Sequence, residues 1–203
     1  MKDFSFDQFL VQFERKGKDL FGEHFQVYDS DKEIIKQLVI YFAKDEEMAL
    51  QYGISLDKGI LLNGPVGCGK TTIMSLFRWF LPQKQRYVLK SCQDVSIQFI
   101  EQGYTVIRKY GRLSFEQDRI NNYCFDDLGT EDTIKQFGNE CNVMGKILSL
   151  RYESYISYNI ITHATTNLTS SEIEDYYGTR IRSRMREMFN LISFEKTTPD
   201  KRA

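Results

Sequence analysis

The chain has 203 residues, 41% of them hydrophobic, and a formal net charge of −1. This length and composition suit one domain with a hydrophobic core, and the near-neutral charge gives no overall attraction to nucleic acid. The first residues lack the features of a secretory signal peptide, and no apolar run approaches the ~20 residues of a membrane-spanning helix. We therefore expect a cytoplasmic protein that makes no membrane contact.

The N-terminal quarter of the chain has the pattern of two helices. Apolar residues at helical spacing predict an amphipathic helix over residues 4–21, and a second helix is predicted over residues 31–51 with Ser30 as its N-cap. Together they form a short helical N-terminal arm, residues 1–50. A core domain is expected to occupy residues 51–203.

From Lys58 onward, apolar strand-like runs alternate with helical patterns. Strands are predicted at residues 59–63, 86–89, 123–126, 159–165 and 190–194. Helices are predicted at residues 71–81, 94–102, 138–155, 169–176 and 179–188, with Thr169 and Glu172 at capping-box spacing, and residues 127–140 are expected to form a loop. This alternation predicts an α/β fold in which helices cover both faces of a parallel sheet.

Residues 64–71 read G-P-V-G-C-G-K-T, the full pattern of a phosphate-binding loop between a predicted strand and a predicted helix. The glycines let backbone N–H groups surround a phosphate, Lys70 supplies charge to the β- and γ-phosphates, and the Thr71 hydroxyl can ligate Mg²⁺. The helix that follows adds the positive end of its dipole. The residues expected to bind the nucleotide are Gly64, Pro65, Val66, Gly67, Cys68, Gly69, Lys70, Thr71 and Thr72.

The four cysteines are far apart in the sequence and include no C-x-x-C pair, so we expect neither a disulfide framework nor a structural zinc site. Cys68 lies in the phosphate-binding loop, close to Lys70 and to a helix N-terminus. Lys70 and a helix N-terminus would both favour its thiolate, which raises a redox role as a minor hypothesis. The alternative is that the loop simply needs a small residue there.

Two carboxylates end the next clear strand pattern, Y-C-F-D-D at residues 123–127. In an open parallel sheet, ligands bind at the carboxyl ends of the strands. We therefore expect Asp126 to ligate Mg²⁺ together with Thr71, and Asp127 to polarise the attacking water.

The strand predicted at residues 159–165 leads to Asn167, whose amide could position that water or contact the γ-phosphate; the alternative is a local turn cap. Arginines then occupy alternate positions from 180 to 186. Arg180 and Arg184 share a helix face, and such a pair could reach the nucleotide of a neighbouring subunit as an arginine finger. A solvated basic face, or contact with nucleic-acid phosphates, explains the same pattern equally well.

These elements in this order resemble the AAA+ ATPases, and within them the DnaC/IstB-like helicase-loader family. The similar stretches are G-I-L-L-N-G-P-V-G-C-G-K-T from Gly59, F-D-D-L-G from Phe125, L-R-Y-E from Leu150, A-T-T-N from Ala164 and G-T-R-I-R-S-R-M from Gly178. The resemblance covers about residues 50–194 and implies a P-loop NTPase with the AAA+ core. It also implies a sensor-1 role for Asn167, and the finger role for Arg184 or Arg180.

In function, the resemblance implies an Mg²⁺-ATP-dependent ATPase of DNA replication or transposition that assembles with other copies of itself on ATP or DNA. Its partners would be a replicative helicase or a transposase-like protein, and single-stranded DNA. The sequence departs from the family pattern in several places. After the metal-binding Asp the family usually has Glu or a second Asp; here it is Asp127, whose shorter carboxylate suggests slow hydrolysis. The strand that leads to Asn167 ends T-T-N where the family commonly has T-S-N, and little sequence follows the last strand, so we expect the helical lid to be reduced or absent.

Two other functions fit parts of the sequence. One is a nucleotide-binding assembly switch without significant turnover, which the short Asp127 side chain favours. The other is a small-molecule P-loop phosphotransferase, although a sensor Asn followed by an arginine-rich helix is not typical of those enzymes. Basic and aromatic residues at 104–112 suit stacking on single-stranded DNA, but surface charges and core aromatics explain them as well.

Overall fold

The computed structural model describes residues 5–112, 115–116, 119–131, 134–136 and 139–202. The chain divides into two compact units. Unit 1 consists of residues 1–56, 64–86 and 192–203, and unit 2 consists of residues 57–63 and 87–191. None of the helices within the described ranges is both long and apolar enough to cross a membrane.

Unit 1 is helical: α1 (Phe6–Phe21), α2 (Asp29–Ala43), α3 (Glu46–Gln51), α4 (Lys70–Phe80) and the short 3₁₀ helix η1 (Gln83–Gln85). Its core is built from phenylalanine rings. Phe13 of α1 and Phe42 of α2 lie 5.2 and 5.3 Å, between ring centroids, from Phe77 of α4, and Phe9 lies 5.2 Å from Phe80. Such pairs add to the free energy gained by burying the rings. The N-terminal helices therefore pack on the helix that follows the phosphate-binding loop; the domain boundary at residue 50 stays a prediction.

The first predicted helix is confirmed as α1. Ser5 caps it in a reciprocal capping box with Gln8. The single helix predicted over 31–51 is wrong. Lys44 takes a left-handed conformation (φ 56°) and ends α2, and Asp45 then caps α3 by accepting from the Met48 N–H at 3.1 Å. Ser30, the expected N-cap, lies inside α2, which begins one residue earlier.

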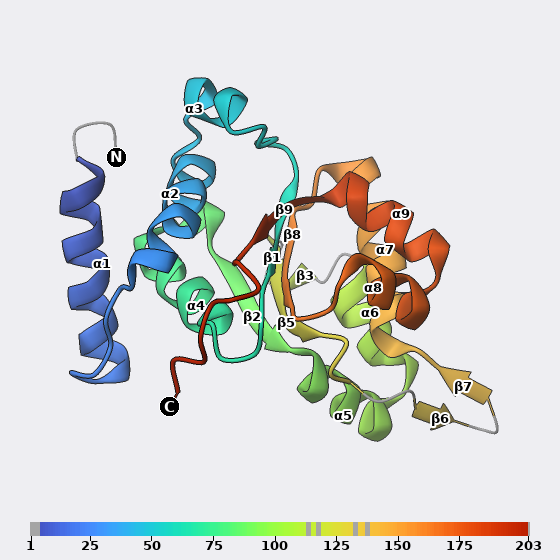
Figure 1. Ribbon diagram of the computed structural model, residues 1–203. Helices are drawn as coiled ribbons and strands as arrows, with labels where there is room; N and C mark the ends of the chain where they lie inside the picture. Colours follow the sequence, from blue (N-terminus) through green and yellow to red (C-terminus); the bar gives the residue numbers. More distant parts are fainter. Residues whose placement is uncertain (1–4, 113–114, 117–118, 132–133, 137–138, 203) are drawn as a thin grey trace. The chain divides into compact units, whose positions relative to one another are not determined.

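The parallel sheet belongs to unit 2 except for the end of β9, and its order is β2 (Tyr87–Ser91), β5 (Asn122–Leu128), β8 (Thr162–Thr166), β1 (Gly59–Asn63) and β9 (Phe189–Ser193) (Figure 1). Its helices are α5 (Cys92–Gln102), α6 (Tyr104–Gly111), α7 (Val143–Tyr158), α8 (Ser170–Tyr177) and α9 (Thr179–Met188). β1 and β8 approach so closely that a Cβ on Gly59 would lie 1.7 Å from the Thr162 carbonyl oxygen. The predicted α/β fold with a parallel sheet is confirmed.

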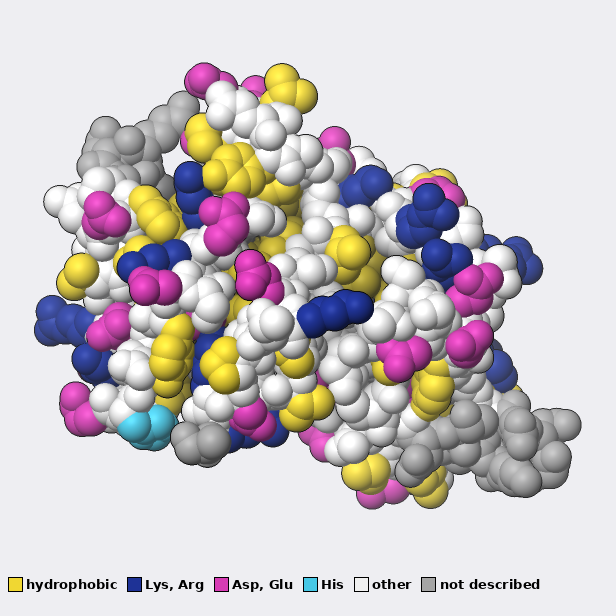
Figure 2. Space-filling model, viewed as in Figure 1, with side chains coloured by type: hydrophobic (Ala, Val, Ile, Leu, Met, Phe, Trp, Pro, Cys, Tyr) yellow, Lys and Arg dark blue, Asp and Glu magenta, His cyan; other side chains and the backbone are white. Residues whose placement is uncertain are grey.

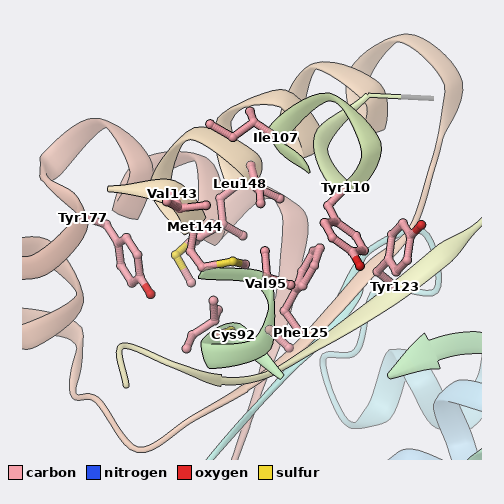
Figure 3. Close-up of a cluster of buried hydrophobic side chains, with 14 of the residues drawn as sticks. Cys92, Val95, Ile107, Tyr110, Tyr123, Phe125, Val143, Met144, Leu148 and Tyr177 are labelled. Atoms are coloured by element: carbon pink, nitrogen blue, oxygen red, sulfur yellow. The ribbon is translucent and has the colours of Figure 1, made fainter. Parts of the chain in front are cut away.

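The core of unit 2 lies between the sheet and helices α5 to α7 (Figure 3). Tyr123 and Phe125 project from β5 with their rings 5.6 Å apart, and Tyr110 of α6 meets Tyr123 edge-on at 5.4 Å. Tyr104 and Tyr110 both lie in the basic and aromatic segment at residues 104–112, but their surroundings differ. Tyr110 belongs to the core, whereas Tyr104 is exposed and lies under the Lys146 ammonium.

Several boundaries differ from the sequence prediction. Residues 127–140, predicted as loop, include strand β6 (Ile134–Gln136) and the start of β7 (Asn139–Cys141), which pair antiparallel. The helix predicted from residue 138 begins only at Val143, because Asn142 caps it by accepting from the Gly145 N–H at 2.7 Å. Helix α6 and the antiparallel pair β3 (Phe115–Glu116) and β4 (Arg119–Ile120) were not predicted.

Candidate nucleotide-binding site

The phosphate-binding loop follows β1 directly and leads into α4. Gly67 and Gly69 have φ values of 78° and 99°, a left-handed conformation that only glycine adopts without strain. Gly69 is the N-cap of α4, so Lys70 and Thr71 are the first residues of the helix. This geometry fits a nucleotide phosphate, because backbone N–H groups and the positive end of the helix dipole converge on the loop.

Lys70 is buried within the loop itself. Its ammonium donates to the carbonyl oxygens of Gly64 at 2.9 Å and Pro65 at 3.0 Å. The charge is therefore held inside the curve of the loop, which is where the sequence pattern requires it for binding phosphate.

Cys68 contradicts the thiolate hypothesis. Its side chain is fully buried, and burial raises the pKa of the thiol more than the nearby Lys70 lowers it. A buried neutral thiol is a poor nucleophile, so Cys68 serves as a small core residue. Gly64 needs to be glycine for the same packing reason, since a Cβ there would lie 2.9 Å from the Cys68 sulfur.

The two carboxylates lie at the carboxyl end of β5, in unit 2. Asp126 is buried, whereas Asp127 is half-buried and has a left-handed backbone (φ 56°). The pairing of β5 with β8 shifts register between Phe125 and Leu128, so both acids lie in a bulge. Bulges redirect side chains at functional sites, and here two consecutive acids near the end of the strand lie in different environments.

Thr165 of β8 organises this turn. Its hydroxyl donates to the Asp126 carboxylate at 2.7 Å and accepts from the Asp127 N–H at 2.8 Å. Sequence reasoning placed Thr165 only within the strand predicted at residues 159–165 and assigned it no role. A hydroxyl at the end of the neighbouring strand was the one available signal, and using it requires the strand order.

Asn167 lies exposed one residue after β8. The chain on both sides of it is held in place. The Thr166 hydroxyl donates to the Leu128 carbonyl at 2.7 Å, and the Asn63 amide at the end of β1 donates to the Leu168 carbonyl at 2.6 Å. Asn167 is therefore presented at the same edge of the sheet as Asp126 and Asp127.

Glu131 is an acidic residue that sequence reasoning missed. It is buried a few residues after Asp127, and its carboxylate accepts from the Gly129 N–H at 2.9 Å and from the Tyr177 hydroxyl. Burial raises its pKa, and the hydrogen bond from Tyr177 partly opposes that rise. Because Tyr177 belongs to α8, this contact joins the segment after β5 to the helix that precedes α9 and its arginines.

The arginines of α9 have different surroundings. Arg184 lies over the Tyr152 ring at 4.9 Å and donates to Ser149, and Arg182 forms an ion pair with Glu174 at 2.6 Å. Arg180 is exposed, as is Arg186. Basic side chains, interspersed with acidic ones, gather over the place of α9 in Figure 2. Of the two finger candidates, Arg180 is therefore the one whose side chain is not held against α7.

Arg151, in the stretch L-R-Y-E, has a structural position. It is buried and donates to the Thr162 hydroxyl at 2.7 Å and to the Ile161 carbonyl at 2.9 Å, and burial lowers its pKa to about 10. It therefore remains charged at neutral pH and fixes α7 to the start of β8.

The chain matches no protein-family model and no curated protein sequence. Solved structures do match. The crystal structure of the DnaC helicase loader aligns with a TM-score of 0.57 and 15% identity, over 91% of this chain and 99% of that one. The chain has the fold of the AAA+ P-loop proteins. The resemblance seen in the sequence is therefore confirmed at the level of the fold.

Two structures of the replication initiator DnaA also match. DnaA from Aquifex aeolicus bound to AMPPCP aligns with a TM-score of 0.55 and 16% identity, over 84% of this chain and 48% of that one. DnaA bound to AMPPCP and single-stranded DNA aligns with a TM-score of 0.53 and 16% identity, over 85% and 49%. This chain thus spans about half the length of the DnaA chains. Both of those DnaA structures contain the nucleotide analogue AMPPCP.

Proposed function

We propose that this protein is an Mg²⁺-ATP-dependent ATPase that acts in DNA replication or transposition by loading or remodelling a helicase-type partner on single-stranded DNA. The observation that carries the proposal is the phosphate-binding loop, with its two left-handed glycines, the buried Lys70 and the start of α4. The likeness to a helicase loader and to DnaA bound to a nucleotide analogue and single-stranded DNA supports the choice of cofactor and partners.

In this proposal each residue of the nucleotide-binding site has a chemical role. The loop amides and Lys70 bind the phosphates, and Thr71 and Asp126 supply the hard oxygen ligands that Mg²⁺ prefers. Bound Mg²⁺ would neutralise charge on the phosphate oxygens. Asp127 orients the attacking water, and Asn167 contacts the γ-phosphate or that water.

The arginine that completes the site would come from a neighbouring copy of the chain, so that ATP or DNA drives self-assembly. Arg180 suits this role better than Arg184, because Arg184 is half-buried against Tyr152. A finger of this kind is worth about 10³–10⁵ in rate in other P-loop proteins. The turnover of an isolated subunit is therefore expected to be low.

A nucleotide switch without significant turnover is the second candidate. The observation that favours it is Asp127, whose side chain is shorter by one methylene than the Glu found at this position in many AAA+ ATPases, although a second Asp also occurs there. Such a protein would bind ATP through the same loop and change its partners on binding alone.

The proposal is tested first by ATP binding to the wild type and to Lys70→Ala. We expect micromolar binding to the wild type and no measurable binding to the variant, because Lys70 is the cation of the loop. Lys84→Ala, which removes an exposed lysine of the same unit, is the matched control. Wild-type affinity in Lys70→Ala would overturn the proposed site.

A further inference from the structure

The segment after β9 returns to the phosphate-binding loop, within unit 1. The Lys201 N–H donates to the Gly67 carbonyl at 3.1 Å, and the Lys201 ammonium donates to the Cys68 carbonyl at 2.6 Å. The contact continues at Asp200, since a Cβ on Gly67 would lie 1.9 Å from a carboxylate oxygen of that residue. Two consecutive carbonyl groups of the loop are thus held by one residue far away in the sequence.

The Lys201 ammonium lies among an acidic partner and two aromatic rings. It forms an ion pair with Asp31 at the start of α2, and the two side chains are only 13% and 6% exposed. The rings of Tyr28 and Phe194 each lie 5.2 Å from the nitrogen. Lys201 therefore joins the phosphate-binding loop to α2 through a nearly buried charge pair, and removing either partner would leave the other charge uncompensated.

The carbonyl contacts determine which way the loop amides point. In a trans peptide the C=O and the following N–H project to opposite sides. With the Gly67 carbonyl turned to Lys201, the Cys68 N–H points back into the loop, 3.4 Å from the Pro65 oxygen. With the Cys68 carbonyl turned the same way, the Gly69 N–H also faces away from Lys201. Both amides are thus directed to the inner side of the loop.

We propose that Lys201 is a positioning residue for the phosphate-binding loop: it holds the peptides 67–69 with their N–H groups turned inward, and so lowers the cost of ordering the loop around a phosphate. The residue acts through the loop backbone and not by touching the nucleotide. The inference rests on the proposed function for its ligand, but the tether itself is a property of the chain without ligand. Asp31 contributes to the same tether, because its ion pair holds the Lys201 ammonium in place.

The first test compares Lys201→Met with Lys196→Met, which removes an exposed lysine from the same segment. Affinities for Mg²⁺-ATP and for pyrophosphate are measured by titration calorimetry on variants shown to be folded. We expect Lys201→Met to bind both ligands about tenfold more weakly, because the ordering cost now falls on binding. Lys196→Met should match the wild type, and Lys201→Arg, which can still donate to Asp31 and the carbonyl, should recover part of the loss.

The second test needs no nucleotide. Hydrogen exchange of peptides covering residues 64–70 should be faster in Lys201→Met and in Asp31→Asn than in the wild type, with exchange in α1 unchanged. Unchanged exchange and unchanged pyrophosphate affinity in folded Lys201→Met would overturn the inference. If the wild type bound neither ATP nor pyrophosphate, the proposed function would fail instead, and the exchange experiment would still decide whether the tether exists. Should Lys201→Met not fold, Asp31→Asn and Lys201→Arg carry the same comparison.

Discussion

Asp127 is the residue whose local geometry bears most directly on the proposed turnover. Its φ of 56° is a conformation that Asp and Asn tolerate but most other residues avoid. Asp127→Asn should therefore keep the bulge and bind ATP as the wild type does, while hydrolysis falls about 10²–10⁴-fold because the base is lost. Binding and steady-state turnover measured on the same preparation check this. Unchanged turnover would remove Asp127 from the mechanism and point to another base.

Thr165 allows a second test at this scale, with serine as a matched control. Thr165→Val removes the hydroxyl that satisfies both Asp126 and the Asp127 N–H, so the free energy of unfolding should fall by about 1–3 kcal/mol. Thr165→Ser keeps the hydroxyl and should lose less than half as much. Urea unfolding measures both. We also expect a weaker Mg²⁺ dependence of ATP binding in the valine variant only. Equal losses of unfolding free energy in the two variants would show that the hydroxyl contributes no more than the methyl group, and would contradict the role given to its hydrogen bonds.

At the scale of elements, Glu131 joins the turn after β5 to α8 through Tyr177. Burial raises the pKa of Glu131 above its ordinary value of 4.5, so the folded state holds this proton more tightly than the unfolded state does. Its contribution to stability is therefore greatest below pH 4.5 and is lost as the pH rises through the folded-state pKa.

Glu131→Gln removes this titration and should give a flatter dependence of unfolding free energy on pH than the wild type above pH 4.5. Urea unfolding at several pH values between about 4.5 and 7.5 checks the difference between the two curves. Glu101→Gln, on the exposed surface of α5, is the control. Parallel curves for the wild type and Glu131→Gln would show that Glu131 does not titrate differently on folding.

Elements whose signals are local could be predicted from the sequence. The phosphate-binding loop, β1 and α9 lie at the positions predicted for them. Each is marked by consecutive residues: the loop by its motif, β1 by its apolar run, and α9 by the glycine, Gly178, directly before it. The capping box of Thr169 and Glu172 is local too, and it begins α8 as expected. The break at Lys44 was missed because neither Gly nor Pro marks it.

Contacts between distant segments account for the rest. Thr165 acquires its role only when β8 lies beside β5, and Glu131 only when α8 packs over its turn. Lys201 lies in a polar stretch that reads as a frayed end, and its contacts with Asp31 and Cys68 span most of the chain. Spacing and periodicity contain no information on such pairs, so these site residues could not be predicted.

At the scale of the whole molecule, the question is whether copies of the chain share their sites. Arg180→Ala should bind ATP normally, since Arg180 is exposed and is not one of the residues of the phosphate-binding loop. When it is mixed with the wild type, activity should fall more steeply than the wild-type fraction, because each variant subunit impairs a neighbour's site. Arg186→Ala, exposed on the same helix, serves as the control. Activity that simply scales with the wild-type fraction would exclude Arg180 as the finger.

The proposed function depends most on ATP hydrolysis by assembled subunits. Its most direct test is Mg²⁺-ATP hydrolysis over a wide range of protein concentrations, with and without single-stranded DNA. If subunits share their sites, specific activity should rise with protein concentration and rise further with DNA. Specific activity that stays constant with concentration and is indifferent to DNA would contradict it and indicate a self-contained site.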